Sequence, residues 1–206
     1  MVHWNVRRAK SIAPGLLRAG LAASCVFAII AMTPAAAQSF SAAPNASFVL
    51  DFDSEDGNFS LWRATDLTGI NALRARATFV RKGQHRQWAP SFAISVGSEG
   101  ADASISFTAA PRSGPLMVEA ALWRGGEPSA EETFLLTPAF QEPFDIHVDW
   151  TEEGLVTFTV FSRAAQAVNG YERRQVNLGQ APTTVRITGS TGEVLFEPLQ
   201  LGHVAR

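Results

Sequence analysis

The chain has 206 residues, of which 17 are lysine or arginine and 19 are aspartate or glutamate, so its net charge is −2. Because the basic residues do not outnumber the acidic ones, the sequence lacks the positive field that binding to nucleic-acid phosphates requires. Its single cysteine, Cys25, excludes an internal disulfide and a metal site built from several thiolates.

The first 37 residues are arranged like a secretory signal peptide. Four basic residues precede an apolar run over residues 21–32, and small residues follow with an A-x-A site at Ala35 and Ala37. We therefore expect cleavage after Ala37 and a mature chain that begins near Gln38. The apolar run is short for an uncleaved membrane anchor. It also continues past Cys25, where a mature lipoprotein would turn polar, which disfavours lipidation.

Removal of this leader would leave no thiol, and 13 basic residues against 19 acidic ones, a net charge of −6. The alanine-rich leader and the preference for arginine over lysine indicate a GC-rich bacterial source. We expect a secreted or periplasmic protein whose mature chain has no membrane span. Residues 38–206 are enough for one domain with a sizeable core, and no linker or repeat divides them.

The first half of the mature chain predicts short strands separated by turns. Residues 47–52 alternate as a strand, an acidic turn follows over 53–58, and residues 59–63 carry Trp62 into the next extended run. Alternation of period two then predicts three further strands, at 73–81, 88–96 and 103–109, separated by the loop 82–87 and the turn 97–102.

The second half continues this pattern. Residues 116–123 are apolar on both faces, which predicts a central strand, and a glycine loop at 124–128 separates them from a strand at 132–137. The polar segment 163–171 includes a predicted helical turn at 164–168. The remaining strands are predicted at 173–178, 183–188 and 193–201, the last two joined by the turn Gly189–Gly192.

A hairpin is predicted over residues 143–162, because two runs of period-two alternation flank the turn Glu152–Gly154. Glycine at the third turn position suits a left-handed conformation. In this register, three apolar pairs face each other across the hairpin: Trp150 with Val156, Val148 with Phe158, and Ile146 with Val160. The opposite face is then polar and carries Asp145, His147, Asp149, Thr157 and Thr159.

The spacing of strands and turns, with no long segment of helical period, predicts an all-β sandwich or barrel of about a dozen strands. The C-terminal third resembles the concanavalin A-like lectin/glucanase superfamily, including its laminin G-like modules. The resemblance rests on a strand ending in Asp149–Trp150, an acidic glycine turn, a valine-rich strand and these closing segments: Val176–Leu178, Ala181–Pro182, Val185–Ser190 and Val194–Gly202. The segment Leu50–Trp62 is similar to the opening strand of several carbohydrate-binding sandwiches. The resemblance implies an antiparallel, two-sheet jelly-roll sandwich with one concave face.

Asp145, His147 and Asp149 are the first candidates for a functional site. At positions i, i+2 and i+4 they point to one side of one strand, and their spacing is similar to the E-x-D-x-E motif of family 16 glycoside hydrolases, whose outer carboxylates are catalytic. On a strand, the outer Cα atoms lie about 13 Å apart, whereas a retaining pair needs carboxyl groups about 5 Å apart. Two short aspartate side chains close this gap poorly. The wider carboxyl separation that an inverting glycosidase uses remains geometrically open. A solvated strand face, a ligand contact and catalysis are retained as interpretations, in that order.

An acidic segment near the start of the mature chain is a candidate metal site. Its oxygen donors are Asp51, Asp53, Glu55, Asp56 and Asn58, and calcium prefers such ligands. An EF-hand is excluded, because Asp56 and Trp62 stand at the positions of its glycine and bidentate glutamate. The resemblance to carbohydrate-binding sandwiches implies calcium between the first and last strands, with Asp51, Asp53 and Glu197 as ligands. The alternative is an acidic surface turn without a metal.

A charged loop is a second candidate binding site. Tryptophan stacks on sugar rings and arginine hydrogen-bonds to hydroxyls, so His85, Arg86 and Trp88 together could bind a sugar. In the alternative interpretation, Trp88 docks into the core. The sequence contains no G-x-S-x-G nucleophile elbow and no H-E-x-x-H zinc motif.

These features predict a non-catalytic module that binds carbohydrate or a cell-surface polymer, with no cofactor other than a structural calcium ion. The predicted ligand-binding residues are His85, Arg86, Trp88, Asp145, His147 and Asp149. One alternative is a polysaccharide-acting hydrolase or lyase of the same fold that uses Asp145, His147 and Asp149. Another is an envelope adhesion protein that binds a protein partner.

Overall fold

A computed structural model describes residues 38–39, 47–84, 89–110, 114–162 and 170–204. They belong to one compact unit, Pro34–Arg206. The signal peptide stays a prediction, since residues 1–37 lie outside the described parts. Within those parts, no helix has the length and apolar character needed to cross a membrane. The described strands are β1 (Gln38–Ser39), β2 (Ser47–Ala64), β3 (Ala72–Lys82), β4 (Ser91–Ser98), β5 (Ala101–Ala109), β6 (Leu116–Arg124), β7 (Glu127–Thr133), β8 (Phe144–Trp150), β9 (Leu155–Phe161), β10 (Tyr171–Asn177) and β11 (Thr184–Gly202).

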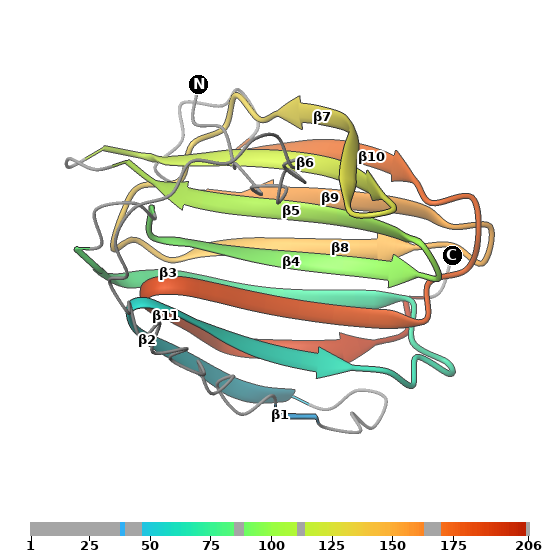
Figure 1. Ribbon diagram of the computed structural model, residues 1–206, viewed down its shortest axis with the longest axis horizontal. Coiled ribbons are helices and arrows are strands. Elements are labelled where there is room, and N and C mark those ends of the chain that lie inside the picture. The colour runs from blue at the N-terminus through green and yellow to red at the C-terminus, as the bar shows by residue number, and fades with distance from the viewer. Residues whose placement is uncertain (1–37, 40–46, 85–88, 111–113, 163–169, 205–206) are drawn as a thin grey trace, which may run out of the picture. The chain divides into compact units, whose positions relative to one another are not determined.

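The strands form two sheets joined through the long strands β2 and β11 (Figure 1). The sheet that we call the β8 sheet contains β10, β9, β8 and β3 with the second half of β11. The β5 sheet contains β7, β6, β5 and β4 with the first half of β11. Strand β2 pairs with β11 along both halves, and the short β1 runs parallel to β2. The predicted all-β, antiparallel jelly-roll sandwich is confirmed.

The two long strands correct the sequence prediction. No turn separates strands at Gly189–Gly192, because β11 continues through this segment and only bends where its partner changes from β4 to β3. The predicted acidic turn at 53–58 is likewise part of β2, whose pairing with β11 passes from Ser54 directly to Phe59. Extra residues in one strand make a sheet bend. The two predicted turns therefore mark the corner at which one ribbon crosses between the sheets.

The core lies between the sheets and is centred on phenylalanine rings. Phe92 of β4 and Phe107 of β5 stack with ring centroids 4.6 Å apart. From the other sheet, Phe144 of β8 lies 5.1 Å from Phe107, and Phe196 of β11 meets Phe92 edge-on at 5.2 Å. These contacts bridge the two layers, so aromatic packing holds the sheets face to face.

The hairpin predicted over residues 143–162 is confirmed. Strands β8 and β9 pair Ile146 with Val160, Val148 with Phe158, and Trp150 with Val156. Of these side chains, Trp150 is 4% exposed and the others are fully buried, as the alternation predicts. Gly154 closes the turn with φ of 86°, in the left-handed region that its position was expected to need.

Near the edge of the β5 sheet the predictions are wrong in detail. The loop expected at 124–128 is the tight turn Gly125–Gly126, with φ of 58° and 82°, and the next strand is β7 rather than residues 132–137. Two left-handed residues in a row give a turn whose twist matches a hairpin. Strand β6 is not central with two buried faces, since it lies beside the edge strand β7 and its Met117 and Glu119 are exposed. The helical turn at 164–168 lies outside the described residues.

The edges of the two sheets meet around Arg174 of β10. Its guanidinium forms an ion pair with Glu172 in the same strand and another, at 3.3 Å, with Glu132 of β7. It also lies 5.2 Å from the ring centroid of Phe134. The Leu136 N–H donates a hydrogen bond of 2.6 Å to Glu172 Oε2. Polar contacts thus close this side of the sandwich.

Candidate functional site

Strand β8 places the three predicted candidates, Asp145, His147 and Asp149, together on the outer face of the β8 sheet. The residues between them are buried in the core, so the alternation of the strand alone sends these three outward. Register with β3 sets Arg76 opposite Asp145 and Arg74 opposite His147. The sequence analysis missed both arginines as site residues. They alternate with apolar residues in β3, but nothing local indicates which strand they face.

Each aspartate is held by one arginine. Arg74 Nη2 lies 2.5 Å from Asp149 Oδ1, while its Nη1 donates to the backbone oxygens of Leu73 at 2.9 Å and Val148 at 3.3 Å. Arg76 forms a forked pair with Asp145, through Nε to Oδ1 at 2.8 Å and Nη2 to Oδ2 at 3.2 Å. Forked pairs fix the planes of both groups. The face therefore carries ordered, neutralised pairs rather than isolated carboxylates.

His147 stands between these pairs and begins a row of rings. Its imidazole centroid is 4.6 Å from that of Phe161, which in turn is 5.6 Å from that of Tyr171. The row crosses β8, β9 and β10, and Tyr171 at its end is 44% exposed. Burial lowers the pKa of His147 below its ordinary value and the cation of Arg74 adds to this, against the opposing carboxylates of Asp149 and Asp145. His147 is therefore a neutral ring at neutral pH.

This geometry disfavours paired-carboxylate catalysis. Asp145 and Asp149 stand at the two ends of one strand, where Cα atoms four residues apart are separated by about 13 Å. Each is also drawn towards a different arginine of β3. A retaining pair requires carboxyl groups about 5 Å apart across a single bond of the substrate. The face can offer donors, acceptors and ring surfaces to a ligand, but its two carboxylates do not converge.

The other predicted site residues are placed as follows. His85, Arg86 and Trp88 lie outside the described residues, and their role stays a prediction. Asp53 forms an ion pair of 2.5 Å with Arg81, which also lies 3.6 Å from Glu193 of β11. Within the described ranges, no three acidic, histidine or cysteine side chains are grouped closely enough to hold a metal ion. Calcium binding by Asp51, Asp53 and Glu197 stays a prediction.

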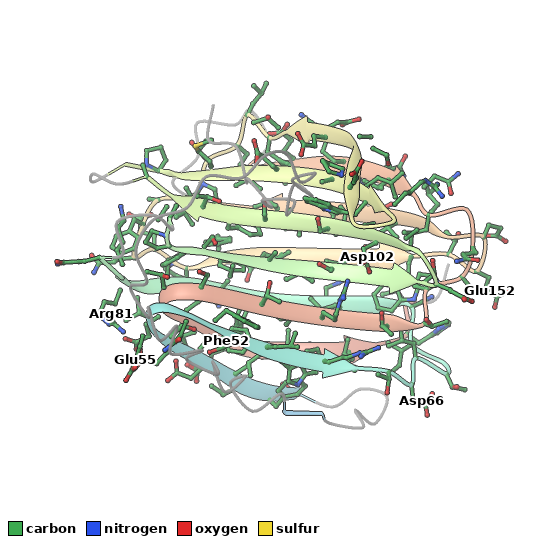
Figure 2. The ribbon with its side chains drawn as sticks, in the orientation of Figure 1. Phe52, Glu55, Asp66, Arg81, Asp102 and Glu152 are labelled. Carbon is green, nitrogen blue, oxygen red and sulfur yellow. The ribbon has the colours of Figure 1, made fainter. Side chains whose placement is uncertain are left out.

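The outer face of the β5 sheet has a different composition, which the sequence analysis did not identify. Its outward positions on β4, β5 and β11 are rich in hydroxyls: Ser91, Ser95, Ser104, Ser106, Thr108, Thr184, Thr188 and Ser190. Trp123 of β6 donates from Nε1 to Ser104 Oγ at 3.0 Å. One ion pair, of 2.6 Å, joins Arg186 to Asp102, which Figure 2 places over this sheet. Alternation of serine with phenylalanine, isoleucine and valine was the available signal.

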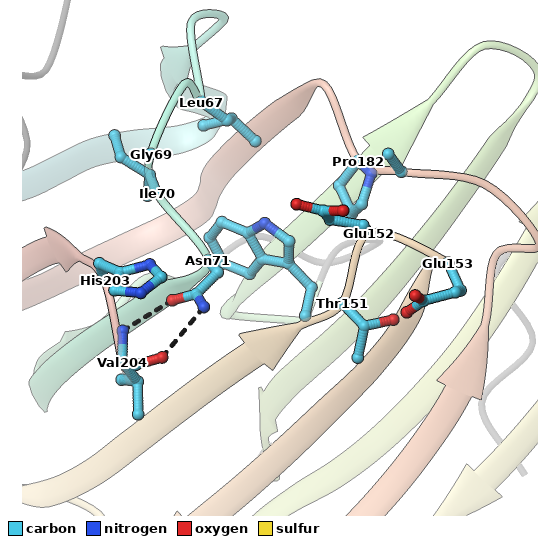
Figure 3. A pocket seen from close by; sticks show the side chains of 12 residues that line it. Leu67, Gly69, Ile70, Asn71, Thr151, Glu152, Glu153, Pro182, His203 and Val204 are labelled. Carbon is cyan, nitrogen blue, oxygen red and sulfur yellow. Dashed lines mark hydrogen bonds between the residues drawn. The ribbon is translucent and has the colours of Figure 1, made fainter. Parts of the chain in front are cut away.

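A cavity of about 440 Å³ opens at the end of the strands beside the turn of the β8–β9 hairpin. In Figure 3, Glu152 and Pro182 line one side, and Asn71 and His203 line the other. The cavity is also lined by Leu67, Gly69, Ile70, Trp150, Thr151, Glu153, Ala181 and Val204. Figure 2 shows Asp66 and Glu152 at this end of the strands and Arg81 and Glu55 at the other.

The end cavity borders a second hollow on the outer face of the β8 sheet. This hollow, lined by Arg74 and Gln200 among others, shares His203 and Val204 with the end cavity. Arg74 is the partner of Asp149, so the hollow begins at the ion-paired face.

No protein-family model matches the chain, and no curated protein matches it. Among solved structures, it is similar to a Crh5 transglycosylase in complex with NAG, with 9% identity, a TM-score of 0.49, and coverage of 77% of this chain and 72% of that one. It is similar to CG-16, a homodimeric agglutinin from chicken liver, with 11% identity, a TM-score of 0.43, and coverage of 76% and 100%. A Scytalido-glutamic peptidase with a peptide-based transition state analog matches with 10% identity, a TM-score of 0.40, and coverage of 76% and 64%.

The chain thus spans less than two thirds of the length of that peptidase. The jelly-roll arrangement of two sheets that the sequence resemblance implied is the one that the strands adopt. Because many activities are built on one such fold, function has to be inferred from the side chains of this chain.

Proposed function

We propose that the protein is a non-catalytic module that binds carbohydrate through the outer face of the β8 sheet. The observation that carries this proposal is the combination, on one face, of two arginine–aspartate pairs with the ring row of His147, Phe161 and Tyr171. The secreted or periplasmic location expected from the leader is part of the same proposal, because polysaccharides of the cell surface are found there.

The chemistry of this face suits a sugar. A sugar hydroxyl both donates and accepts hydrogen bonds, and a guanidinium beside a carboxylate offers both functions side by side. Sugar rings also have apolar C–H faces, which pack on aromatic rings. Arg76 is 52% exposed and its partner Asp145 is 39% exposed, so this pair remains accessible to a ligand.

The alternatives have less support. A hydrolase or lyase would need groups that converge on one bond, and the two ion-paired aspartates of β8 stand apart. An adhesion protein would bind a protein partner, and the described face offers no extended apolar patch of the kind that such interfaces bury. Both alternatives are outcomes of the experiment below.

The test is a glycan array probed with the mature chain and two variants. Arg76→Ala combined with His147→Ala should abolish the glycan signal, because it removes one ion pair and the first ring of the row. Ser95→Ala combined with Thr188→Ala, on the opposite sheet, should leave the signal unchanged. Thermal unfolding of each variant checks that the fold is retained. Cleavage of any glycan by the mature chain would establish the enzyme instead. A pull-down that yields one protein partner, with no signal on the glycan array, would establish the adhesion protein.

A further inference from the structure

The end cavity is a second binding feature, and its walls are fixed by backbone contacts. Asn71 holds one wall through two hydrogen bonds to Val204: its Oδ1 accepts from the Val204 N–H at 2.7 Å, and its Nδ2 donates to the Val204 oxygen at 3.1 Å (Figure 3). Its backbone N–H donates to the Gly202 oxygen at 3.0 Å, and its backbone oxygen accepts from the Trp150 N–H at 2.9 Å. Asn71 thus holds both Val204 in the wall and Trp150 in the floor of the cavity.

The opposite wall is the turn that carries Glu152 and Glu153. The Gly154 oxygen accepts a hydrogen bond of 2.9 Å from the Leu178 N–H, and the Gly154 N–H donates to the Thr151 oxygen at 3.1 Å. A Cβ atom on Gly154 would lie 2.2 Å from the Gln180 oxygen, so the turn is packed tightly against the neighbouring loop. The two glutamates are therefore presented on a rigid support at the rim.

The lining of the cavity has a distinct charge. Two carboxylates, of Glu152 and Glu153, face it, whereas none of its lining residues is a lysine or an arginine. The floor is apolar, with Ile70 and the indole of Trp150, and Asn71 and His203 add polar atoms at the rim. Carboxylates at the rim of a cavity attract an organic cation through charge. A volume of about 440 Å³ admits one ring-sized group.

We propose that this cavity binds the ammonium group of an amine-bearing sugar unit, with Glu152 as the main counter-ion. The inference rests on the proposed function, since the hollow lined by Arg74 shares His203 and Val204 with the cavity, and Arg74 pairs with Asp149 on the glycan-binding face. It narrows the ligand class from any glycan to glycans with free amino groups. An N-acetylated unit carries no charge and loses the attraction of the rim.

The experiment compares two probes of equal length by calorimetry, fully deacetylated and fully acetylated oligomers of glucosamine. At a pH below the pKa of the amine, the deacetylated oligomer should bind roughly fivefold more tightly, as expected for one partly exposed charge pair. Glu152→Gln should remove this preference. The matched control is Glu142→Gln, which changes the net charge equally in the exposed segment that precedes β8, at the other end of that strand.

Each result decides a different point. Equal affinity for the two oligomers, with binding still lost in the Arg76→Ala, His147→Ala variant, overturns the amine site but keeps the glycan-binding face. A preference for the deacetylated oligomer that survives Glu152→Gln, or falls equally in Glu142→Gln, reflects general attraction to an acidic protein and overturns the inference. Failure of both oligomers to bind, with no signal on the glycan array, overturns the proposed function as well.

Discussion

The outer faces of the two sheets differ although both sheets enclose the same core. The β8 sheet presents Arg74 and Arg76 paired with aspartates, and a row of rings that begins at His147. On β4, β5 and β11, the β5 sheet presents mostly serine and threonine, together with the ion pair of Arg186 and Asp102. Core packing determines the inward residues of both sheets, whereas the outward residues are constrained only by weaker contacts between neighbouring strands. The two faces therefore offer different chemical groups to a ligand.

The largest expected effect concerns the core that the two sheets share. Phe92 is 2% exposed and packs against rings from both sheets, so Phe92→Ala should lower the free energy of unfolding by about 3–5 kcal/mol. Urea denaturation monitored by tryptophan fluorescence and by circular dichroism measures this. Both probes should shift together, and separate transitions would show that the sheets do not unfold as one unit.

A second comparison sets the turn of one sheet against the turn of the other. Gly154 has φ of 86° and no room for a Cβ atom, whereas Gly100, between β4 and β5, has φ of 75° and open space around its Cβ position. Gly154→Ala should cost about 1–3 kcal/mol, and Gly100→Ala about 1 kcal/mol from the backbone alone. Equal losses in denaturation experiments would contradict the tight packing of Gly154 on Gln180.

The ion pairs of the two faces permit a third comparison. Double-mutant cycles of Arg74 with Asp149 and of Arg186 with Asp102 should each yield a coupling of about 0.2–1 kcal/mol, because all four side chains remain partly exposed. Only the Arg74 variant should also weaken glycan binding. A binding loss in the Arg186 variant of similar size would assign the ligand to the β5 sheet instead.

The smallest expected effect is a dependence of stability on pH that arises on the β8 face. Because the pKa of His147 is lowered in the folded protein, the unfolded chain binds more protons as the pH falls below about 6.5. The free energy of unfolding should therefore decrease as the pH falls from about 6.5 to the folded-state pKa. Above about pH 6.5 it should not depend on this group. His147→Gln should flatten the profile. The control is His203→Gln, which replaces an exposed histidine, and a flattening of equal size there would contradict the assignment.

The β8–β9 hairpin shows which structural features can be predicted from the local sequence pattern. Alternation over residues 143–162 and the glycine at 154 were sufficient to predict the register of β8 with β9, the burial of Trp150 and the outward set on β8. Strand period and turn chemistry depend on residues close together in the chain, so they can be predicted from the sequence. At Gly189–Gly192 the same logic failed, because a bend within a long strand and a turn between two strands use the same small residues.

What the sequence determined by itself was the fold class, the inward and outward residues of the β8–β9 hairpin, and the candidate residues Asp145, His147 and Asp149. Only the tertiary structure brought β3 beside β8 and so paired Arg74 with Asp149 and Arg76 with Asp145. It alone assembled the end cavity, whose walls come from residues 67–71, 150–153, 181–182 and 203–204. Contacts between distant segments depend on which strands pair across the sheet, and alternation within one strand carries no information about its neighbour.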